Sequence, residues 1–246
     1  MAAGDQRKVI TAADPAALAQ IAADRVLARI SANSGRVAIC LTGGSSPKRL
    51  YQLLATETYR SQIPWDRVHW FIGDERFVAA DNPLHNMGVA RQIFLDRLAP
   101  PANIHPIPTG AADPDEAARL YERELQSFYG ADELGPARLL FDVVLMGIGP
   151  DGHTASLFPK YPAVSETKRW VVGVPQAHVD PFVPRVSLTL PALASCREML
   201  FELAGHEKRA ILAKLSTDES LPANRARSLG ETVLLVDQAA LGEKTV

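Results

Sequence analysis

The sequence is poor in the residues that define several large classes of protein. Its 246 residues include two cysteines, which are too few for a disulfide framework or a cysteine-rich zinc site. Acidic and basic residues nearly balance, at 28 and 26, and they are interspersed along the chain. Such a charge distribution gives no general attraction to nucleic acid or to an anionic membrane. We therefore expect neither partner, and any bound anion must be held by a local site.

Long apolar runs are also missing. No stretch reaches the length of a membrane span, and the first ten residues, MAAGDQRKVI, lack the apolar core of a signal peptide. These absences predict a cytoplasmic protein whose thiols stay reduced. Cys40, which lies in an apolar, strand-like run, is then expected to be a small buried residue and not a nucleophile.

Several catalytic signatures are absent as well. No serine lies in a G-x-S-x-G elbow and no H-E-x-x-H motif is present. The loop TGGSSP is not a Walker A loop, and GIGPDG does not match the dinucleotide fingerprint. A covalent serine hydrolase and a nucleotide-dependent dehydrogenase are therefore disfavoured. We expect no metal and no cofactor.

What the sequence does contain is an alternation of apolar, strand-like runs with helix-like stretches over its whole length. This pattern, with no linker, predicts one domain, residues 1–246, with an open, mainly parallel α/β sheet flanked by helices on both faces, a Rossmann-like three-layer sandwich. The predicted strands are residues 37–41, 68–73, 104–107, the first half of 139–159, 170–174, 185–190, 199–204 and 233–236. The predicted helices are residues 15–30, 47–54, 86–98, 114–128 and 191–194, one that ends at 215, and a short one at the C-terminus.

Four of the predicted strands end in polar or glycine-rich segments. These segments begin at Thr42, Asp74, Gly147 and Gly205, and the last of them contains Lys208. The carboxyl ends of parallel strands meet at one edge of a sheet, beside a crevice. We therefore expect this edge to combine a phosphate cradle, a carboxylate with an arginine, a histidine and a lysine.

The first segment is the loop TGGSSP. Gly43 and Gly44 let backbone N–H groups approach a ligand closely, and Ser46 is a candidate N-cap for a helix that begins at Pro47. Free amides and the positive dipole end at a helix N-terminus attract phosphate. An ordinary capped turn between a strand and a helix explains these residues equally well.

Three charged residues, Asp74, Glu75 and Arg76, directly follow a buried strand. Charged groups are costly in such a place unless they are solvated or used. Asp74 fits an acid/base or orienting carboxylate, and Arg76 fits a cation for a phosphate or an oxyanion. A solvated loop with an Asp–Arg pair is the alternative. Likewise, His85 and Asn86 either line the crevice or only form a turn.

The stretch LLFDVVLMGIGPDGHTASLFP, residues 139–159, is the most informative in the chain. Its first half is typical of a strand buried on both faces, and it runs into a loop that contains Asp151 and His153. We expect both side chains at the sheet edge. The simpler interpretation of the loop alone is a glycine-rich turn in which Asp151 caps a helix and His153 merely lies near the surface.

These segments resemble one known family. LTGGSSPKRLYQLL, WFIGDERFV followed by HNM, DVVLMGIGPDGHTASLFP, PRVSLTLPAL and GHEKRAIL are similar to the 6-phosphogluconolactonases, within a larger group that includes glucosamine-6-phosphate deaminase. The similar blocks run from Leu41 to about Leu212. The block from Gly147 to Pro159 is the most specific of them.

The resemblance implies hydrolysis of 6-phospho-D-glucono-1,5-lactone to 6-phosphogluconate, the second step of the oxidative pentose phosphate pathway. By position, it makes His153 the catalytic base, with Asp74 and Arg76 close by. The residues that would hold the sugar phosphate are Thr42, Gly43, Gly44, Ser45, Ser46, Arg185 and Lys208. The expected partner is thus a small phosphosugar lactone, and we expect a monomer or a weak homodimer.

Lactone opening needs one base, an activated water and stabilisation of an oxyanion. In this scheme His153 takes a proton from water as it attacks C1, and then protonates the departing ring oxygen. Either Asp74 or Asp151 orients the imidazole. Backbone amides of residues 149–152, or the guanidinium of Arg76, stabilise the oxyanion.

Two other functions stay open. The deaminase branch carries a glutamate where this chain has Phe158, and ring opening of an amino sugar needs that additional acid/base group. The lactonase interpretation is therefore preferred. A catalytically silent phosphosugar-binding module is the other alternative, and it would leave Asp74 and His153 without a use.

Overall fold

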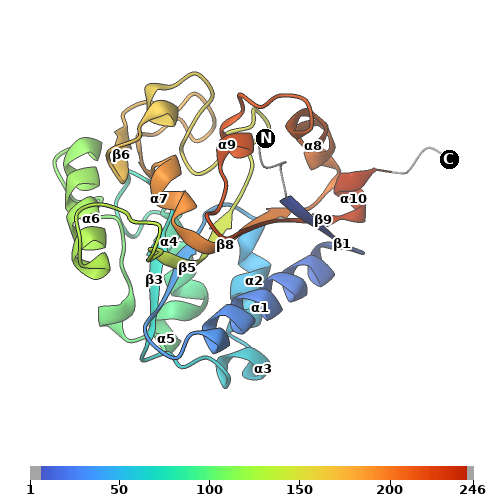
Figure 1. The fold of residues 1–246 in the computed structure, drawn as a ribbon, viewed down its shortest axis with the longest axis horizontal. Coiled ribbons are helices and arrows are strands. Elements are labelled where there is room, and N and C mark those ends of the chain that lie inside the picture. Colours follow the sequence, from blue (N-terminus) through green and yellow to red (C-terminus); the bar gives the residue numbers. More distant parts are fainter. Residues whose placement is uncertain (1–6, 243–246) are drawn as a thin grey trace.

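The computed structural model describes residues 7–242, so most of the N-terminal stretch in which we expect no signal peptide lies outside the described residues. The centre of the fold is a six-stranded sheet, in the order β1-β9-β8-β5-β2-β3, whose neighbouring strands are all parallel (Figure 1). The strands are β1 (Arg7–Ala12), β2 (Val37–Leu41), β3 (Val68–Ile72), β5 (Phe141–Met146), β8 (Cys196–Leu203) and β9 (Glu231–Asp237).

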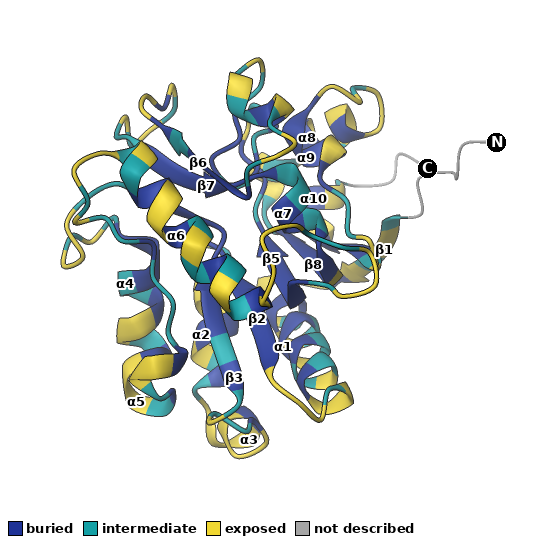
Figure 2. Cartoon of the chain, turned by 60° about the vertical axis from the view of Figure 1, so that its left-hand side comes forward, coloured by how far each residue is buried: buried dark blue, intermediate teal, exposed yellow. Residues whose placement is uncertain are grey.

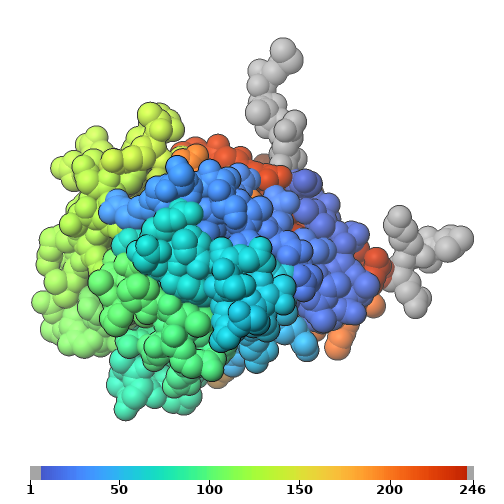
Figure 3. Space-filling model, turned by 90° about the horizontal axis from the view of Figure 1, so that it is seen from below, coloured from blue at the N-terminus to red at the C-terminus, as the bar shows by residue number. Residues whose placement is uncertain are grey.

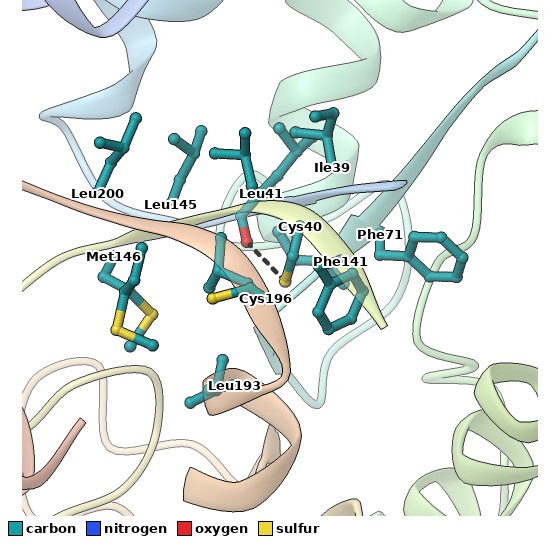
Figure 4. Close-up of a cluster of buried hydrophobic side chains, with 14 of the residues drawn as sticks. Ile39, Cys40, Leu41, Phe71, Phe141, Leu145, Met146, Leu193, Cys196 and Leu200 are labelled. Carbon is teal, nitrogen blue, oxygen red and sulfur yellow. Dashed lines mark hydrogen bonds between the residues drawn. The ribbon is translucent and has the colours of Figure 1, made fainter. Parts of the chain in front are cut away.

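The central strand β5 is buried along its whole length, as its continuous apolar run predicts. Val144 of β5 pairs with Cys40 of β2 on one side and with Met199 of β8 on the other. Figure 4 shows that the side chains of these strands point to two opposite sides of the sheet. Those of Ile39, Leu41, Leu145 and Leu200 lie on one side, and those of Cys40 and Met146 lie on the other, where Leu193 of the helix Leu190–Ala194 also lies.

Helices cover both faces of this sheet, which confirms the three-layer prediction (Figure 1). The helices α1 (Pro15–Ala32) and α2 (Pro47–Leu54) lie on one face, and α6 (Pro114–Tyr129), α7 (Leu190–Ala194) and α8 (Arg209–Leu215) lie on the other. The face seen in Figure 3 is built mainly from the first half of the described chain. This distribution follows from right-handed connections, because the chain crosses the sheet in one direction up to β3 and returns in the other.

The two long helices start at the caps that the sequence predicts. The Asp14 carboxylate accepts hydrogen bonds from the amides of Ala16 and Ala17, both at 2.8 Å, and Asp113 accepts one from Glu116 at 2.7 Å. Gly130 ends α6 in the left-handed conformation. Figure 2 shows that α6 turns a buried side to the protein and an exposed side to solvent, as its amphipathic sequence requires.

The remaining helices are short. They are α3 (Glu57–Arg60), α4 (Asn86–Ala90), α5 (Asp96–Leu98), α9 (Pro222–Arg225) and α10 (Gln238–Leu241), with a π-helical segment at Arg91–Leu95 and 3-10 turns at Pro101–Asn103, Pro162–Ser165 and His206–Lys208. The predicted helix over 86–98 is thus α4, the π-helical segment and α5 in succession.

Not every predicted strand belongs to this sheet. The segments 170–174 and 185–190 do form strands, but they do not join the parallel sheet. Strands β6 (Val171–Val174) and β7 (Arg185–Leu188) pair antiparallel with each other, and β4 (Asp74–Arg76) pairs with β7 to complete a separate three-stranded sheet. The ten proline-rich residues between β6 and β7 are too few for a parallel crossover, so the chain turns back on itself.

Two further differences have local causes. The edge strand β1 was not expected, because its first residues are charged and Val9 is exposed, so its sequence lacks a buried run. The predicted strand 104–107 is wrong. Only an isolated bridge joins Ile104 to Trp70, and Pro106 and Pro108 supply no backbone N–H group to a ladder.

Cys40 is a free, fully buried thiol, as the apolar run around it predicts, and Cys196 is also free. Among residues 7–242, no helix combines the length and the apolar character that crossing a membrane requires.

Candidate active site

A pocket of about 190 Å³ opens at the carboxyl edge of the parallel sheet. It takes residues from the ends of β2 and β5, from β8, and from β4 and β7 of the small sheet. The lining residues are Thr42, Gly43, Gly44, Ser45, Ser46, Pro47, Asp74, Arg76, Asn86, Met146, Gly147, Ile148, Gly149, His153, Ala155, Arg185, Glu202 and Lys208. All the residues predicted for the site lie in this lining except Asp151, which stands directly behind it.

The loop after β2 is held from within the protein. Tyr51 of α2 donates a hydrogen bond to the carbonyl of Thr42 at 2.7 Å, and its hydroxyl accepts one from the Thr42 amide at 3.1 Å. Gly44 has φ +97°, a conformation that favours glycine. A side chain at Gly43 would overlap Asn86, which donates to the carbonyl of Asp74. The loop therefore presents its backbone to the pocket.

One detail of this loop differs from the prediction. Pro47 does open α2, but Ser46 is already helical and its hydroxyl makes no capping hydrogen bond. Because Ser46 does not cap α2, its hydroxyl is available to a ligand in the pocket.

His153 and Asp151 form a close pair. The two groups are joined by Nδ1 of His153 and Oδ1 of Asp151, 2.6 Å apart, and the same oxygen accepts from the His153 amide at 3.1 Å. Burial opposes ionisation of Asp151, but the hydrogen bonds and the charge of His153 outweigh it and hold the pKa of that carboxyl well below its usual range. An ionised Asp151 fixes the proton on Nδ1, so that Nε2 carries the lone pair.

A second histidine contacts the same carboxylate. Nε2 of His178, in the connection between β6 and β7, lies 3.0 Å from Oδ2 of Asp151. Its ring packs on Phe158, with centroids 4.9 Å apart. Asp151 therefore links two imidazoles: that of His153, which lines the pocket, and that of His178, which is partly exposed. The sequence analysis missed His178, because nothing in its local sequence distinguishes it from a surface histidine.

The position of the His153 ring is enforced by its neighbours. The ring lies against Gly149, where any side chain would overlap it. On another side it contacts the fully buried ring of Phe158, with centroids 4.9 Å apart. The Gly149 amide donates to the His153 carbonyl at 2.9 Å, which closes the loop on itself.

Asp74 lines the pocket but is engaged elsewhere. Its Oδ2 accepts a hydrogen bond of 2.6 Å from the hydroxyl of Ser156, and its backbone belongs to β4, opposite Ser187. Of the two aspartates that could orient His153, only Asp151 is hydrogen-bonded to its imidazole.

Two arginines face each other across the small sheet. Arg76 of β4 pairs in register with Arg185 of β7, and like charges in that arrangement repel. Arg185 is buried, which lowers its pKa, while the charge of Asp74 opposes that shift. Nε of Arg76 is buried without a partner among the described residues. An anion in the pocket would relieve both the repulsion and the unmet donor.

Lys208 approaches the pocket from the turn after β8. Its ammonium donates to the carbonyl of Ile148 at 2.8 Å, and burial lowers its pKa. A lysine ammonium has three donors, so this contact leaves others for a ligand. Burial also means that its charge is poorly screened by solvent.

Behind the pocket lies a buried acid that the sequence analysis did not assign. Glu75 accepts from the amides of Asn86 and Met87 at 2.6 and 2.8 Å, and burial, the largest influence, raises its pKa to about 8. His85 lies 3.1 Å from Glu75 and caps α4. Of the two residues that either line the crevice or form a turn, Asn86 lines it and His85 does not.

Glu202 is a charged lining residue that was not predicted from the sequence. It could have been noticed as one charged residue inside the apolar run MLFELA of a predicted strand. No group of three or more histidine, cysteine or acidic side chains within residues 7–242 is arranged to hold a metal ion.

The fold and the pocket define a class of protein: a parallel α/β protein with a glycine-rich, cationic pocket at the carboxyl edge of its sheet. Within that class, the chain belongs to the family described as glucosamine-6-phosphate isomerases/6-phosphogluconolactonase, whose model matches residues 13–234.

Individual relatives agree with this family. A 6-phosphogluconolactonase from Synechocystis is 41% identical over 217 residues, which are 85% of this chain and 85% of that protein. One from Nostoc is 37% identical over 243 residues, 95% of this chain and 96% of its own. The solved structure of 6-phosphogluconolactonase from Trypanosoma cruzi superimposes with a TM-score of 0.84 at 29% identity, covering 98% of each chain.

Proposed function

We propose that the protein hydrolyses 6-phospho-D-glucono-1,5-lactone to 6-phosphogluconate. The observation that carries this proposal is the His153–Asp151 pair at one wall of a pocket whose other walls are a glycine-rich loop and three cations. Relatives named 6-phosphogluconolactonase, similar over most of both chains, support the choice of reaction.

The base in this reaction is His153. The Nδ1–H group of His153 donates a hydrogen bond to Asp151. Its Nε2 atom is therefore free to accept a proton from water as the water attacks the lactone carbonyl carbon, C1. A C–O bond forms at C1, and the ring C–O bond then breaks. The imidazolium gives its proton to the departing ring oxygen, which becomes the hydroxyl of the product. Asp151 stabilises the imidazolium while it exists.

Negative charge develops on the former carbonyl oxygen in this step. Arg76 is the group best suited to receive it, because its buried Nε has no partner among the described residues. Asp74, which is hydrogen-bonded to Ser156, lies at the same wall. Its negative charge partly compensates the positive charges of the two arginines. Loop amides of residues 149–152 are the alternative donors.

The phosphate lies at the opposite end of the pocket in this proposal. The loop from Thr42 to Ser46 supplies backbone N–H groups, while Lys208 and Arg185 supply charge. Anchoring the far end of the substrate orients C1 toward His153, which removes much of the entropic cost of reaction.

The deaminase alternative is less well supported by the site. The ring that packs on His153 at this position is Phe158, which is fully buried and carries no acid/base group. A silent phosphosugar-binding module would not need the ordered His153–Asp151 pair. A single domain over residues 1–246, cytoplasmic location and a monomer or weak homodimer stay predictions.

The test is lactone opening by the purified protein. The lactone is generated in situ from glucose 6-phosphate, and its decay is followed with wild type, His153→Ala, His206→Ala and no protein. His206 is a solvent-exposed histidine and serves as the matched control. We expect fast opening with wild type and His206→Ala, and a rate near the blank with His153→Ala. Wild-type opening at the blank rate, with turnover of glucosamine 6-phosphate instead, would show the deaminase; binding without turnover of either would show the silent module.

A further inference from the structure

Glu202 is a charged residue in the middle of a buried strand. It lies in β8, in the run Met199 to Leu203, and is 3% exposed. Glu202 is nevertheless one of the residues that line the pocket. Because side chains alternate along a strand, Glu202 shares a face of the sheet with Leu200, whose position is seen in Figure 4.

Both carboxyl oxygens of Glu202 are buried without a hydrogen-bond partner within the described part of the chain. An unpartnered buried acid costs stability. Other buried acids of this protein are satisfied: Glu198, four residues earlier in the same strand, contacts Arg25 and Arg29, and Asp237 accepts from backbone amides. Glu202 differs from these acids in lacking a hydrogen-bond partner within the described part of the chain, and it lies beside the pocket.

The groups that face this part of the pocket come from several elements. Tyr51 of α2, whose hydroxyl holds Thr42, has its pKa raised mainly by burial, with a contribution from the charge of Glu202. Lys208 comes from the turn after β8. The other titratable side chains in the lining are those of Asp74, Arg76, His153 and Arg185. The electrostatic interaction with Tyr51, whose hydroxyl is hydrogen-bonded to Thr42, places Glu202 near the loop assigned to phosphate.

An ionised carboxylate there would repel a phosphate dianion, which offers acceptors only. A neutral carboxyl group instead has one O–H to donate. Burial raises the pKa of Glu202 to about 8, so the neutral form prevails at pH 7.

We propose that Glu202 is a phosphate-binding residue, whose protonated carboxyl group donates a hydrogen bond to the phosphate of the bound phosphosugar. This inference rests on the proposed function for the identity of the ligand. The bound phosphate would give the carboxyl group of Glu202 a hydrogen-bond partner. Glu202 would add a neutral donor to a phosphate site that otherwise consists of backbone amides and cations. It also makes phosphate binding sensitive to pH, because ionisation of Glu202 turns a donor into a repelling charge.

The experiment measures the dissociation constant of 6-phosphogluconate by calorimetry at pH 7 and pH 9, with gluconate as the ligand that lacks phosphate. The proteins are wild type, Glu202→Gln, Glu202→Leu and Glu219→Gln. Glutamine keeps a donor at every pH, leucine removes it, and Glu219 is an exposed glutamate outside the pocket that receives the same substitution.

We expect wild type and Glu219→Gln to bind roughly tenfold more weakly at pH 9 than at pH 7, the factor for a required proton with a pKa one unit below the higher pH. Glu202→Gln should lose most of that dependence, and what remains reports Lys208. Glu202→Leu should bind roughly tenfold to a hundredfold more weakly at pH 7, as for a lost hydrogen bond to a charged group. Gluconate should bind weakly to all four.

Thermal unfolding separates this role from a structural one. Replacing an unpartnered buried acid with leucine should raise Tm or leave it unchanged, whereas a structural glutamate would lower it. Wild-type affinity in Glu202→Leu, or an unaltered pH dependence in Glu202→Gln, overturns the inference while lactone opening by the wild type upholds the proposed function. Absence of opening with Glu202-dependent binding overturns the function alone, and a wild type that neither opens the lactone nor binds 6-phosphogluconate overturns both.

Discussion

At the scale of single residues, the site depends on how tightly its groups are packed. His153 cannot swing away from the pocket, because Gly149 and Phe158 confine its ring and Asp151 holds Nδ1. A base that is fixed before the substrate arrives requires no reorganisation during the reaction. The glycine at 149 is thus required for space and not for an unusual φ angle.

Gly149→Ala tests this packing. The added methyl group overlaps the imidazole, so the ring must move, and misplacement of a base by about an ångström costs roughly a hundredfold in kcat. Lactone opening measured under saturating substrate gives the value. Gly110→Ala is the matched control, because a methyl group there meets open space. Near wild-type kcat in Gly149→Ala would show that the position of the ring does not limit the reaction.

Sequence reasoning could not choose between Asp74 and Asp151 as the partner of His153. Both follow buried strands, and both end at the same edge of the sheet. The choice depends on two contacts. The hydroxyl of Ser156 donates a hydrogen bond to Asp74, and a tight turn brings Asp151 against the imidazole of His153. Neither contact is visible in the order of residues.

At the scale of elements, the small antiparallel sheet is what completes the pocket. Its strands β4 and β7 supply Asp74, Arg76 and Arg185, and the connection between β6 and β7 supplies His178. The parallel sheet alone provides the loop, the histidine and the lysine. The pocket is therefore assembled between two sheets, and the sequence analysis predicted the residues but not that arrangement.

His178→Ala tests the contribution of that connection. His178 contacts Asp151 and not the pocket, so its loss should loosen the carboxylate that orients His153 while the phosphate end stays intact. We expect kcat to fall on the order of tenfold, a typical effect of removing an outer partner, with KM nearly unchanged. The steady-state kinetics of His178→Ala and of the exposed-histidine variant His206→Ala supply the comparison. A rise in KM at constant kcat would instead place His178 in substrate binding.

At the scale of the whole molecule, two buried acids make stability depend on pH. Burial raises the pKa of Glu75 and of Glu202 to about 8, from an ordinary value of 4.5. Between these values the folded protein keeps protons that the unfolded chain releases, so stability falls as pH rises through this window and levels off above it. Asp151, with its lowered pKa, acts in the opposite direction in more acidic solution, and His69 and His85, whose pKa burial lowers, do so up to the ordinary histidine value of about 6.5. The net fall in stability is therefore expected above that pH.

The midpoint of thermal unfolding, followed from pH 6.5 to pH 8, tests this behaviour. Tm of the wild type should decrease over that range, and Glu202→Gln should decrease less, because its side chain has no proton to lose. Glu219→Gln should follow the wild type. If Glu202→Gln and wild type run parallel over the whole range, Glu202 is ionised in the folded protein below pH 8 and the predicted shift is wrong.

Much of this molecule could be predicted from periodicity and caps. The alternation of strands and helices, the caps at Asp14 and Asp113 and the buried strand β5 all follow local rules. What could not be predicted depends on tertiary contacts. The charged edge strand β1 is recognisable through its pairing with β9, and the charged residue Glu202 of β8 lies beside a pocket.

The pairing of β1 with β9 also bears on how the chain acquires its structure during synthesis. β1 is the first strand of the described chain to be made, and β9, residues 231–237, is the last. Figure 1 shows the two strands side by side. The first strand therefore has no ladder partner until almost all of the chain has left the ribosome, and it must stay unaggregated in the meantime. Arg7 and Lys8 made this strand hard to predict from the sequence. Their charges also protect the strand before β9 is made, since charged edges resist pairing with other chains.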